Sequence, residues 1–212
     1  MTPFHARRSD DRAQAHTLEA FVAAILLVAG LTFALQATAV TPLSASTSNQ
    51  HIENQQRAVA TDLLETSAAN GDLHEAVLYW DPVDGRFAGV PEGFDEHVHG
   101  GPPNAFGEAL DRTFLDRRIA FNVYVDAHPS TSSRGEPMVN MGRPSDNAVS
   151  ATRTVSVTDD TTLTAPGFEG TTLADVAPDP DGGTAGPEFY APDVDDGPTY
   201  NTLEVRIVVW RM

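Results

Sequence analysis

Glu19 is the residue whose position in the sequence most strongly suggests chemistry. It directly precedes Ala20–Val40, a run of 21 residues without a charged side chain. An ionised carboxylate at the edge of a hydrocarbon layer is unfavourable unless a positive charge compensates it. Hydrolysis of the peptide bond before Gln14 or Ala15 would free an α-amine, and in an assembly one subunit's amine would then be able to neutralise a neighbour's Glu19. Two simpler roles compete with this pairing: Glu19 extends to the membrane interface, or it interacts with the positive end of the helix dipole.

The pair His97 and His99, beside Asp95 and Glu96, is the best candidate for a metal site. On a strand, alternate residues face the same way, so both imidazoles would be able to chelate zinc. No third histidine follows at a characteristic spacing, and Gly-Gly-Pro-Pro comes next. We therefore expect a solvated loop.

Two acidic clusters suggest a hard cation such as calcium, namely Asp179, Asp181 and Glu188, and Asp193, Asp195 and Asp196. Both lack the spaced ligands and the terminal Glu of a calcium-binding loop, so an acidic surface explains them better. The sequence has no cysteine, no G-x-S-x-G, no phosphate-binding glycine loop and no H-E-x-x-H. We expect a protein that is not an enzyme and needs neither a metal nor another cofactor.

The charge of the chain is concentrated after the apolar run. The net charge is −17, and the part from Thr41 onward contains ten arginines and 27 acidic residues. All 13 basic residues are arginine. An acidic surface without lysine indicates a halophilic protein, because concentrated salt screens the repulsion between its carboxylates. Nucleic acid is not an expected partner, since nothing here would neutralise a run of phosphates.

The apolar run must act as the element that positions Glu19. As a helix, Ala20–Val40 would be about 31 Å long, which matches the hydrocarbon thickness of a lipid bilayer. Three arginines precede the run, whereas the 20 residues after it contain only Arg57. The excess of positive charge predicts a single-pass protein of the cell membrane with a cytoplasmic N-terminus and residues 41–212 outside the cell.

Four segments are therefore predicted. They are a basic cytoplasmic leader (1–13), a transmembrane helix (14–40), a helical stalk (41–70) and an acidic extracytoplasmic α+β domain (71–212). Pro42 should kink the helix or end its first section. Apolar residues at helical spacing predict a second section over residues 49–69, which Asn70-Gly71 ends.

The domain after the stalk is predicted to be a small antiparallel sheet packed against helix. Residues 76–80 fit either a helix or the first strand of a hairpin that turns at residues 81–85, and residues 86–104 are loop-like. A helical stripe runs over residues 106–114. Alternating apolar residues predict strands at 119–126, 149–158 and 203–209. Residues 159–202 are rich in Pro, Gly, Asp and Thr, which favours a long surface excursion rather than core.

The N-terminal residues resemble those of archaeal type IV pilin-like proteins, which carry a class III signal peptide. The similarity lies in Arg12-Ala13 followed by Gln14, then Thr17, Glu19 and the apolar run. Residues 12–56 are more closely similar to an uncharacterised haloarchaeal family of pilin-like membrane proteins. The resemblance implies that a prepilin peptidase removes the leader at the cytoplasmic side. It also implies that the apolar helix then packs against other pilin-like subunits in a filament core.

The processing site differs from the usual pattern by one residue. Cleavage after Ala13 makes Glu19 the sixth residue of the mature chain, whereas the family usually has the acid fifth. Cleavage after Gln14 restores the fifth position at a less usual site. Two alternatives stay open: an unprocessed membrane-anchored binding module, or a secreted protein released by cleavage after Ala39 in the small-x-small sequence Ala37-Thr38-Ala39.

Overall fold

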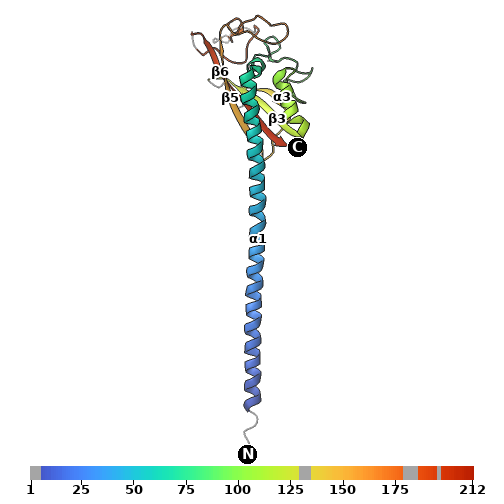
Figure 1. Ribbon diagram of the computed structural model, residues 1–212, viewed down its shortest axis with the longest axis vertical. Helices are drawn as coiled ribbons and strands as arrows, with labels where there is room; N and C mark the ends of the chain where they lie inside the picture. The colour runs from blue at the N-terminus through green and yellow to red at the C-terminus, as the bar shows by residue number, and fades with distance from the viewer. Residues whose placement is uncertain (1–5, 129–134, 179–185, 195–196) are drawn as a thin grey trace, which may run out of the picture. The chain divides into compact units, whose positions relative to one another are not determined.

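The computed structural model describes residues 6–128, 135–178, 186–194 and 197–212, and for residues 6–13 and 37–49 it describes the backbone alone. The chain divides into two compact units, Met1–His51 and Ile52–Met212. The first unit is helical, and the second holds every strand of the described residues (Figure 1).

One helix, α1 (Ala6–Asn70), replaces the two helical sections that were expected. Of the two outcomes expected at Pro42, a kink or an end of the helix, the end is therefore wrong. A proline within a helix removes one backbone N–H bond, and the turns on either side can retain theirs. The predicted stop at Asn70-Gly71 is confirmed, because Gly71 has a φ of 88° that continues no helix.

The second unit is built on a four-stranded antiparallel sheet in the order β4-β3-β6-β5. Its strands are β3 (Ile119–Asp126), β4 (Glu136–Asn140), β5 (Val149–Thr158) and β6 (Thr199–Arg211). Three of them confirm the alternating pattern of the sequence, and β4 is an addition. Long strand β6 pairs with both β3 and β5, so it lies in the middle of the sheet.

The main core covers one face of this sheet. Helix α3 (Ala105–Thr113) and the last turns of α1 contribute to it, and Figure 1 shows both elements beside the sheet. Asn104 begins α3, since its side-chain oxygen accepts a hydrogen bond from the Gly107 amide at 3.0 Å. The largest buried residues of these helices are Leu63, Leu64, Phe106 and Leu110. With Phe114, which directly follows α3, they pack with residues of the sheet, namely Phe121, Val123, Val205, Ile207 and Val209.

Residues 72–87 contain both structures between which the sequence did not decide. A short helix, α2 (Asp72–Val77), is followed by a hairpin of β1 (Trp80–Asp81) and β2 (Arg86–Phe87). The Asp81 carboxylate accepts hydrogen bonds from the amides of residues 83 and 84, and Gly85 has a φ of 65°. The turn thus comes from an Asx interaction and one glycine.

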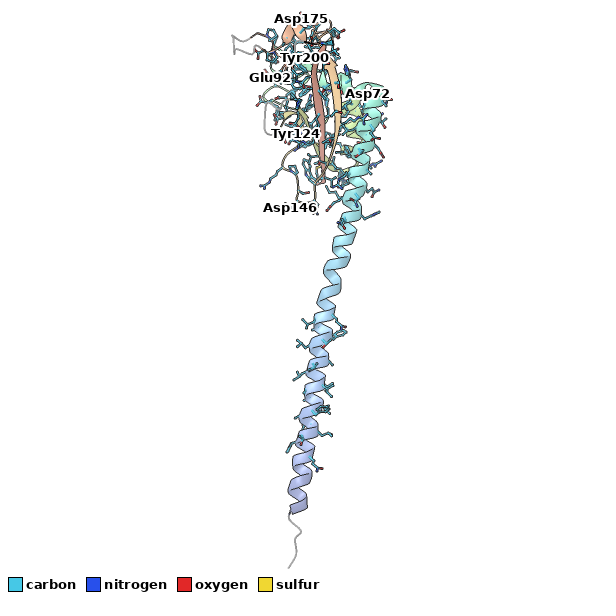
Figure 2. The ribbon with its side chains drawn as sticks, turned by 90° about the vertical axis from the view of Figure 1, so that its left-hand side faces the viewer. Asp72, Glu92, Tyr124, Asp146, Asp175 and Tyr200 are labelled. Carbon is cyan, nitrogen blue, oxygen red and sulfur yellow. The ribbon has the colours of Figure 1, made fainter. Side chains whose placement is uncertain are left out.

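The expectation that residues 159–202 form a surface excursion is wrong. A 3₁₀ helix, η2 (Ala174–Val176), lies within this stretch, and the start of β6 lies at its end. The segment places several side chains in the core: Leu163, Ala165, Leu173, Val176, Phe189, Ala191 and Tyr200. The Tyr200 hydroxyl donates to the Ala191 carbonyl at 2.8 Å, and Figure 2 labels this residue beside the strands. Widely spaced apolar residues in a Pro- and Gly-rich stretch therefore close one end of the core.

Candidate functional site

The helical segment Gln14–Gln36 is long and apolar enough to cross a membrane, and a signal sequence would have the same composition. All of its side chains are exposed, and Figure 2 shows them projecting to both sides of the helix. Ten of these side chains are large and apolar, between 47% and 75% exposed: Leu18, Phe21, Val22, Ile25, Leu26, Leu27, Val28, Leu31, Phe33 and Leu35. No face of this segment is polar enough to be the water-facing side of a soluble helix.

Thr32, a polar residue in the apolar part of this segment, has a local hydrogen-bond partner. The Thr32 hydroxyl donates to the Val28 carbonyl at 2.7 Å, one helical turn back. Such a bond lets a hydroxyl enter hydrocarbon without an unpaired donor. The Thr32 hydroxyl is therefore in a form that a lipid bilayer accepts.

The predicted processing residues lie along α1. Gln14 and Ala15 are exposed. Arg12 and Ala13 belong to the same helix, but their side chains lie outside the described residues, and so does the side chain of Ala39 at the alternative secretory site.

Glu19 has one neighbour that the sequence analysis did not identify. The Nδ1 atom of His16 lies 3.7 Å from the Glu19 Oε2 atom, in an i,i+3 arrangement. The two side chains are 80% and 82% exposed, so they form an ion pair only when His16 is protonated, and water screens it. The helical spacing of His16 and Glu19 was the available signal.

The expectation of a solvated loop is wrong for His97, one residue of the pair His97 and His99. His97 is 6% exposed, and its backbone bridges to β4 through bonds with Met138 and Asn140. Its Nε2 atom lies 3.2 Å from the Ala88 carbonyl oxygen. Burial lowers the pKa of His97, against the opposing effects of the Ala88 hydrogen bond and the Asp111 charge. His97 is therefore a neutral structural side chain at neutral pH.

His99, by contrast, is exposed, and its ring meets that of Phe94 at a centroid distance of 6.4 Å. Within the described ranges no three His, Asp or Glu side chains converge as a metal site would need. The acidic clusters at 179–181 and 195–196 lie outside those ranges, although Glu188 and Asp193 are described.

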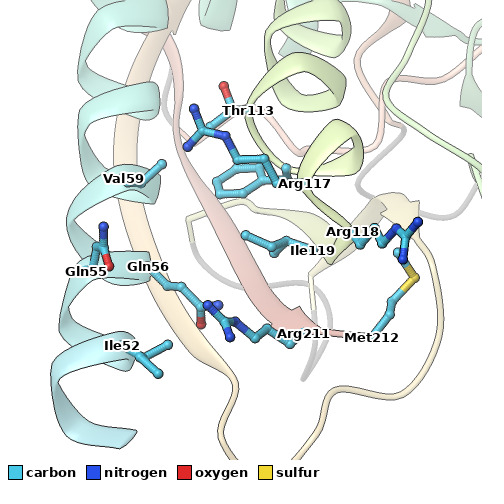
Figure 3. A pocket seen from close by; sticks show the side chains of 11 residues that line it. Ile52, Gln55, Gln56, Val59, Thr113, Arg117, Arg118, Ile119, Arg211 and Met212 are labelled. Carbon is cyan, nitrogen blue, oxygen red and sulfur yellow. The ribbon is translucent and has the colours of Figure 1, made fainter. Parts of the chain in front are cut away.

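A cavity of about 470 Å³ lies in the second unit where α1, the end of α3, β3 and β6 meet (Figure 3). Its charged and polar lining side chains are Gln55, Gln56, Thr113, Arg117, Arg118 and Arg211. Arg117 ends the 3₁₀ helix η1 (Leu115–Arg117), and Arg118 has a φ of 59°, which turns the chain from η1 into β3. The pairing of Ile119 with Arg211 places the start of β3 beside the end of β6. We call this space the arginine cavity.

Comparison with known proteins gives one match. The model of a family of unknown function, DUF7288, matches residues 12–209. No curated protein and no solved structure matches the chain.

Proposed function

The chain belongs to the DUF7288 family, and we propose that it is a non-enzymatic, single-pass membrane protein, a type IV pilin-like subunit or accessory of a haloarchaeal surface filament. The observation that carries the proposal is a helix segment, Gln14–Gln36, that is apolar on all sides and has one acid, Glu19, near its start. A bilayer would cover this segment before assembly, and neighbouring helices would cover it in a filament.

The free energy of covering this segment favours burial strongly. Burying one large apolar side chain contributes about 1.5–3 kcal/mol relative to full exposure. Because ten such side chains are at least 47% exposed, covering them stabilises the segment by on the order of 10 kcal/mol. A protein in water would not keep that surface open, and the segment needs lipid or other helices around it.

Glu19 gives the proposal its assembly step. In the proposed sequence of events, a prepilin peptidase hydrolyses the bond before Gln14 or Ala15 and leaves a protonated α-amine. The amine of one subunit then pairs with Glu19 of its neighbour, where low dielectric strengthens the attraction. This pairing would fix the axial position of each subunit, because a mispaired carboxylate in hydrocarbon is costly.

The charge of the remaining chain supports the proposed topology. The arginines before the apolar run favour a cytoplasmic leader, and the acidic residues after Thr41 belong to the domain outside the cell. The same acidity supports work in concentrated salt. Lipid, the peptidase and other pilin-like subunits are the proposed partners.

A second candidate function has its own supporting observation. His16 already stands 3.7 Å from Glu19 and would compensate it without any cleavage. In that case the chain is an unprocessed, membrane-anchored surface module that does not polymerise.

A set of four variants in the native cell separates these two functions. Glu19→Ala and Glu19→Gln remove the charge, Glu19→Asp keeps it, and the matched control His16→Ala removes only the neighbour within the same helix. The proposal predicts normal membrane insertion in all four, with loss of sheared surface filaments only for Glu19→Ala and Glu19→Gln. Equal filament recovery from Glu19→Gln and the parent would refute the assembly role. Filament recovery that none of the four variants changes would favour the anchor, which does not polymerise.

A further inference from the structure

The arginine cavity concentrates positive charge in a protein that is otherwise strongly acidic. The chain has 13 basic and 30 acidic residues, yet three arginines and no Asp or Glu side chain line this cavity. A carboxylate at Met212 would offset only one of these charges. No acidic side chain in the lining therefore competes for these guanidinium groups.

The guanidinium groups of the cavity are also free to bind. Across the described part of the chain, the side chains of Arg117, Arg118 and Arg211 form no ion pair and no hydrogen bond. Arg86 and Arg206, in contrast, pair with Asp84 and Asp126 at 2.8 Å and 3.5 Å. The cavity therefore holds cations whose hydrogen-bonding capacity is not used within the fold.

Gln56 provides an independent sign of a missing ligand. It lines the cavity from α1 and is only 8% exposed, yet its buried Nε2 atom has no hydrogen-bond partner among the described residues. Buried amide groups nearly always have a partner, because an unpaired one loses its hydration without compensation. In Figure 3 the side chains of Gln56 and Arg211 extend toward each other, and that of Arg117 reaches toward α1 beside Val59. Donors from three elements thus border the same space.

We propose that the arginine cavity binds a phosphate group, with Gln56, Arg117 and Arg211 as donors and Arg118 at its edge. A guanidinium presents N–H groups in a planar fork that fits two oxygens of an oxyanion. A tetrahedral phosphate has oxygens for several donors that approach from different directions, whereas a carboxylate offers two oxygens in one plane. The arrangement of donors on α1, η1 and β6 suits the tetrahedral group. This inference holds whether or not the protein forms filaments.

A phosphate group can come from a lipid headgroup or from free phosphate, and the test separates these sources. The full chain in uncharged detergent is titrated with inorganic phosphate and, separately, with dihexanoyl phosphatidic acid below its micelle concentration. Dihexanoylglycerol, which has the same chains and no phosphate, is the control ligand. Ionic strength is held constant by replacing chloride, and calorimetry measures the dissociation constants.

The variants Arg117→Gln and Arg211→Gln should each weaken binding about tenfold to a hundredfold, as expected for one charged hydrogen-bonding group. Arg117→Lys keeps the charge but loses the fork, and it should weaken binding several-fold. The matched control Arg153→Gln removes an exposed arginine of β5 that does not line the cavity, and it should leave the affinity unchanged. Circular dichroism confirms that each variant retains the fold.

Each outcome of the titration decides the proposal. Binding of both ligands with these losses supports a general phosphate site, and binding of the lipid alone supports a headgroup site. The proposal is overturned if neither ligand binds. It is also overturned if Arg153→Gln weakens binding as much as Arg211→Gln, which would indicate diffuse attraction. A peptide carrying residues 188–197 that binds more tightly than phosphate would overturn it in favour of carboxylates from a second copy.

Discussion

Replacing Phe189 by Ala tests the finding that the Pro- and Gly-rich segment belongs to the core. Phe189 is 2% exposed, and its ring lies 4.2 Å from that of Tyr190 and 5.9 Å from that of Tyr200, measured between centroids. Its amide also donates to the Val176 carbonyl at 2.7 Å, so the backbone there is held in place and cannot easily close a cavity. Truncation of such a residue costs about 3–5 kcal/mol.

The expected loss is large enough to measure by thermal unfolding. One kcal/mol shifts the unfolding midpoint of a domain of this size by about 2–4 °C. The Phe189→Ala variant should therefore unfold roughly 6–20 °C below the parent, as followed by near-ultraviolet circular dichroism of the full chain in uncharged detergent.

Phe94→Ala is the matched control, because Phe94 is 43% exposed and its ring lies 6.4 Å from that of His99, measured between centroids. It should change the midpoint by little. Equal midpoints for the two variants would refute the reasoning and indicate that residues 159–198 lie on the surface rather than in the core.

Three further predictions concern individual buried groups of the second unit. Because burial lowers the pKa of His97 below 6.5, the unfolded chain takes up a proton first, and stability should fall as the pH falls from about 6.5 through the lowered value. His97→Gln should reduce that fall in denaturant titrations, and an unchanged pH profile would contradict the assignment. Burial, with the charge of Glu96, raises the pKa of Glu136 above 4.5. The stability that its protonated carboxyl contributes to the fold is therefore lost as the pH rises through the raised value. Glu136→Gln should therefore raise the denaturation midpoint at pH 7, and a lower midpoint would show that the carboxylate is stabilising. Gly107→Ala should lower the free energy of unfolding by roughly 3 kcal/mol, since an added Cβ would overlap the Pro102 carbonyl. Gly186→Ala meets no atom within 4 Å and should unfold like the parent.

Local pattern was sufficient where one side of an element faces the core. Strand β3 alternates Phe121, Val123 and Val125 with other residues, and α3 repeats its apolar residues at helical spacing. These periods identified the α+β fold directly from the sequence. Strand β4 was not predicted, because it has only five residues and includes Pro137. The proline is tolerated there since β4 lies at the edge of the sheet.

Contacts between distant residues could not be predicted in the same way. The arginine cavity joins Arg117 to Arg211 only because β3 and β6 pair in a register that sets Ile119 opposite Arg211. His97 is buried because its backbone pairs with β4, a strand that was itself unpredicted. Pro42 is the opposite case: a proline is a strong local signal for the end of a helix, yet α1 continues through it because the helical turns on either side are retained.

The identity of the first residue of the mature chain tests the central proposal most directly. Native membranes and sheared surface material are digested, and the N-terminal peptide is identified by mass spectrometry. The pilin-like account predicts a peptide that begins at Gln14 or Ala15 and retains the segment to Gln36. A chain that begins at Val40 would contradict it, because the apolar helix would then be a discarded signal, and an intact leader in both fractions would contradict processing and favour the plain anchor.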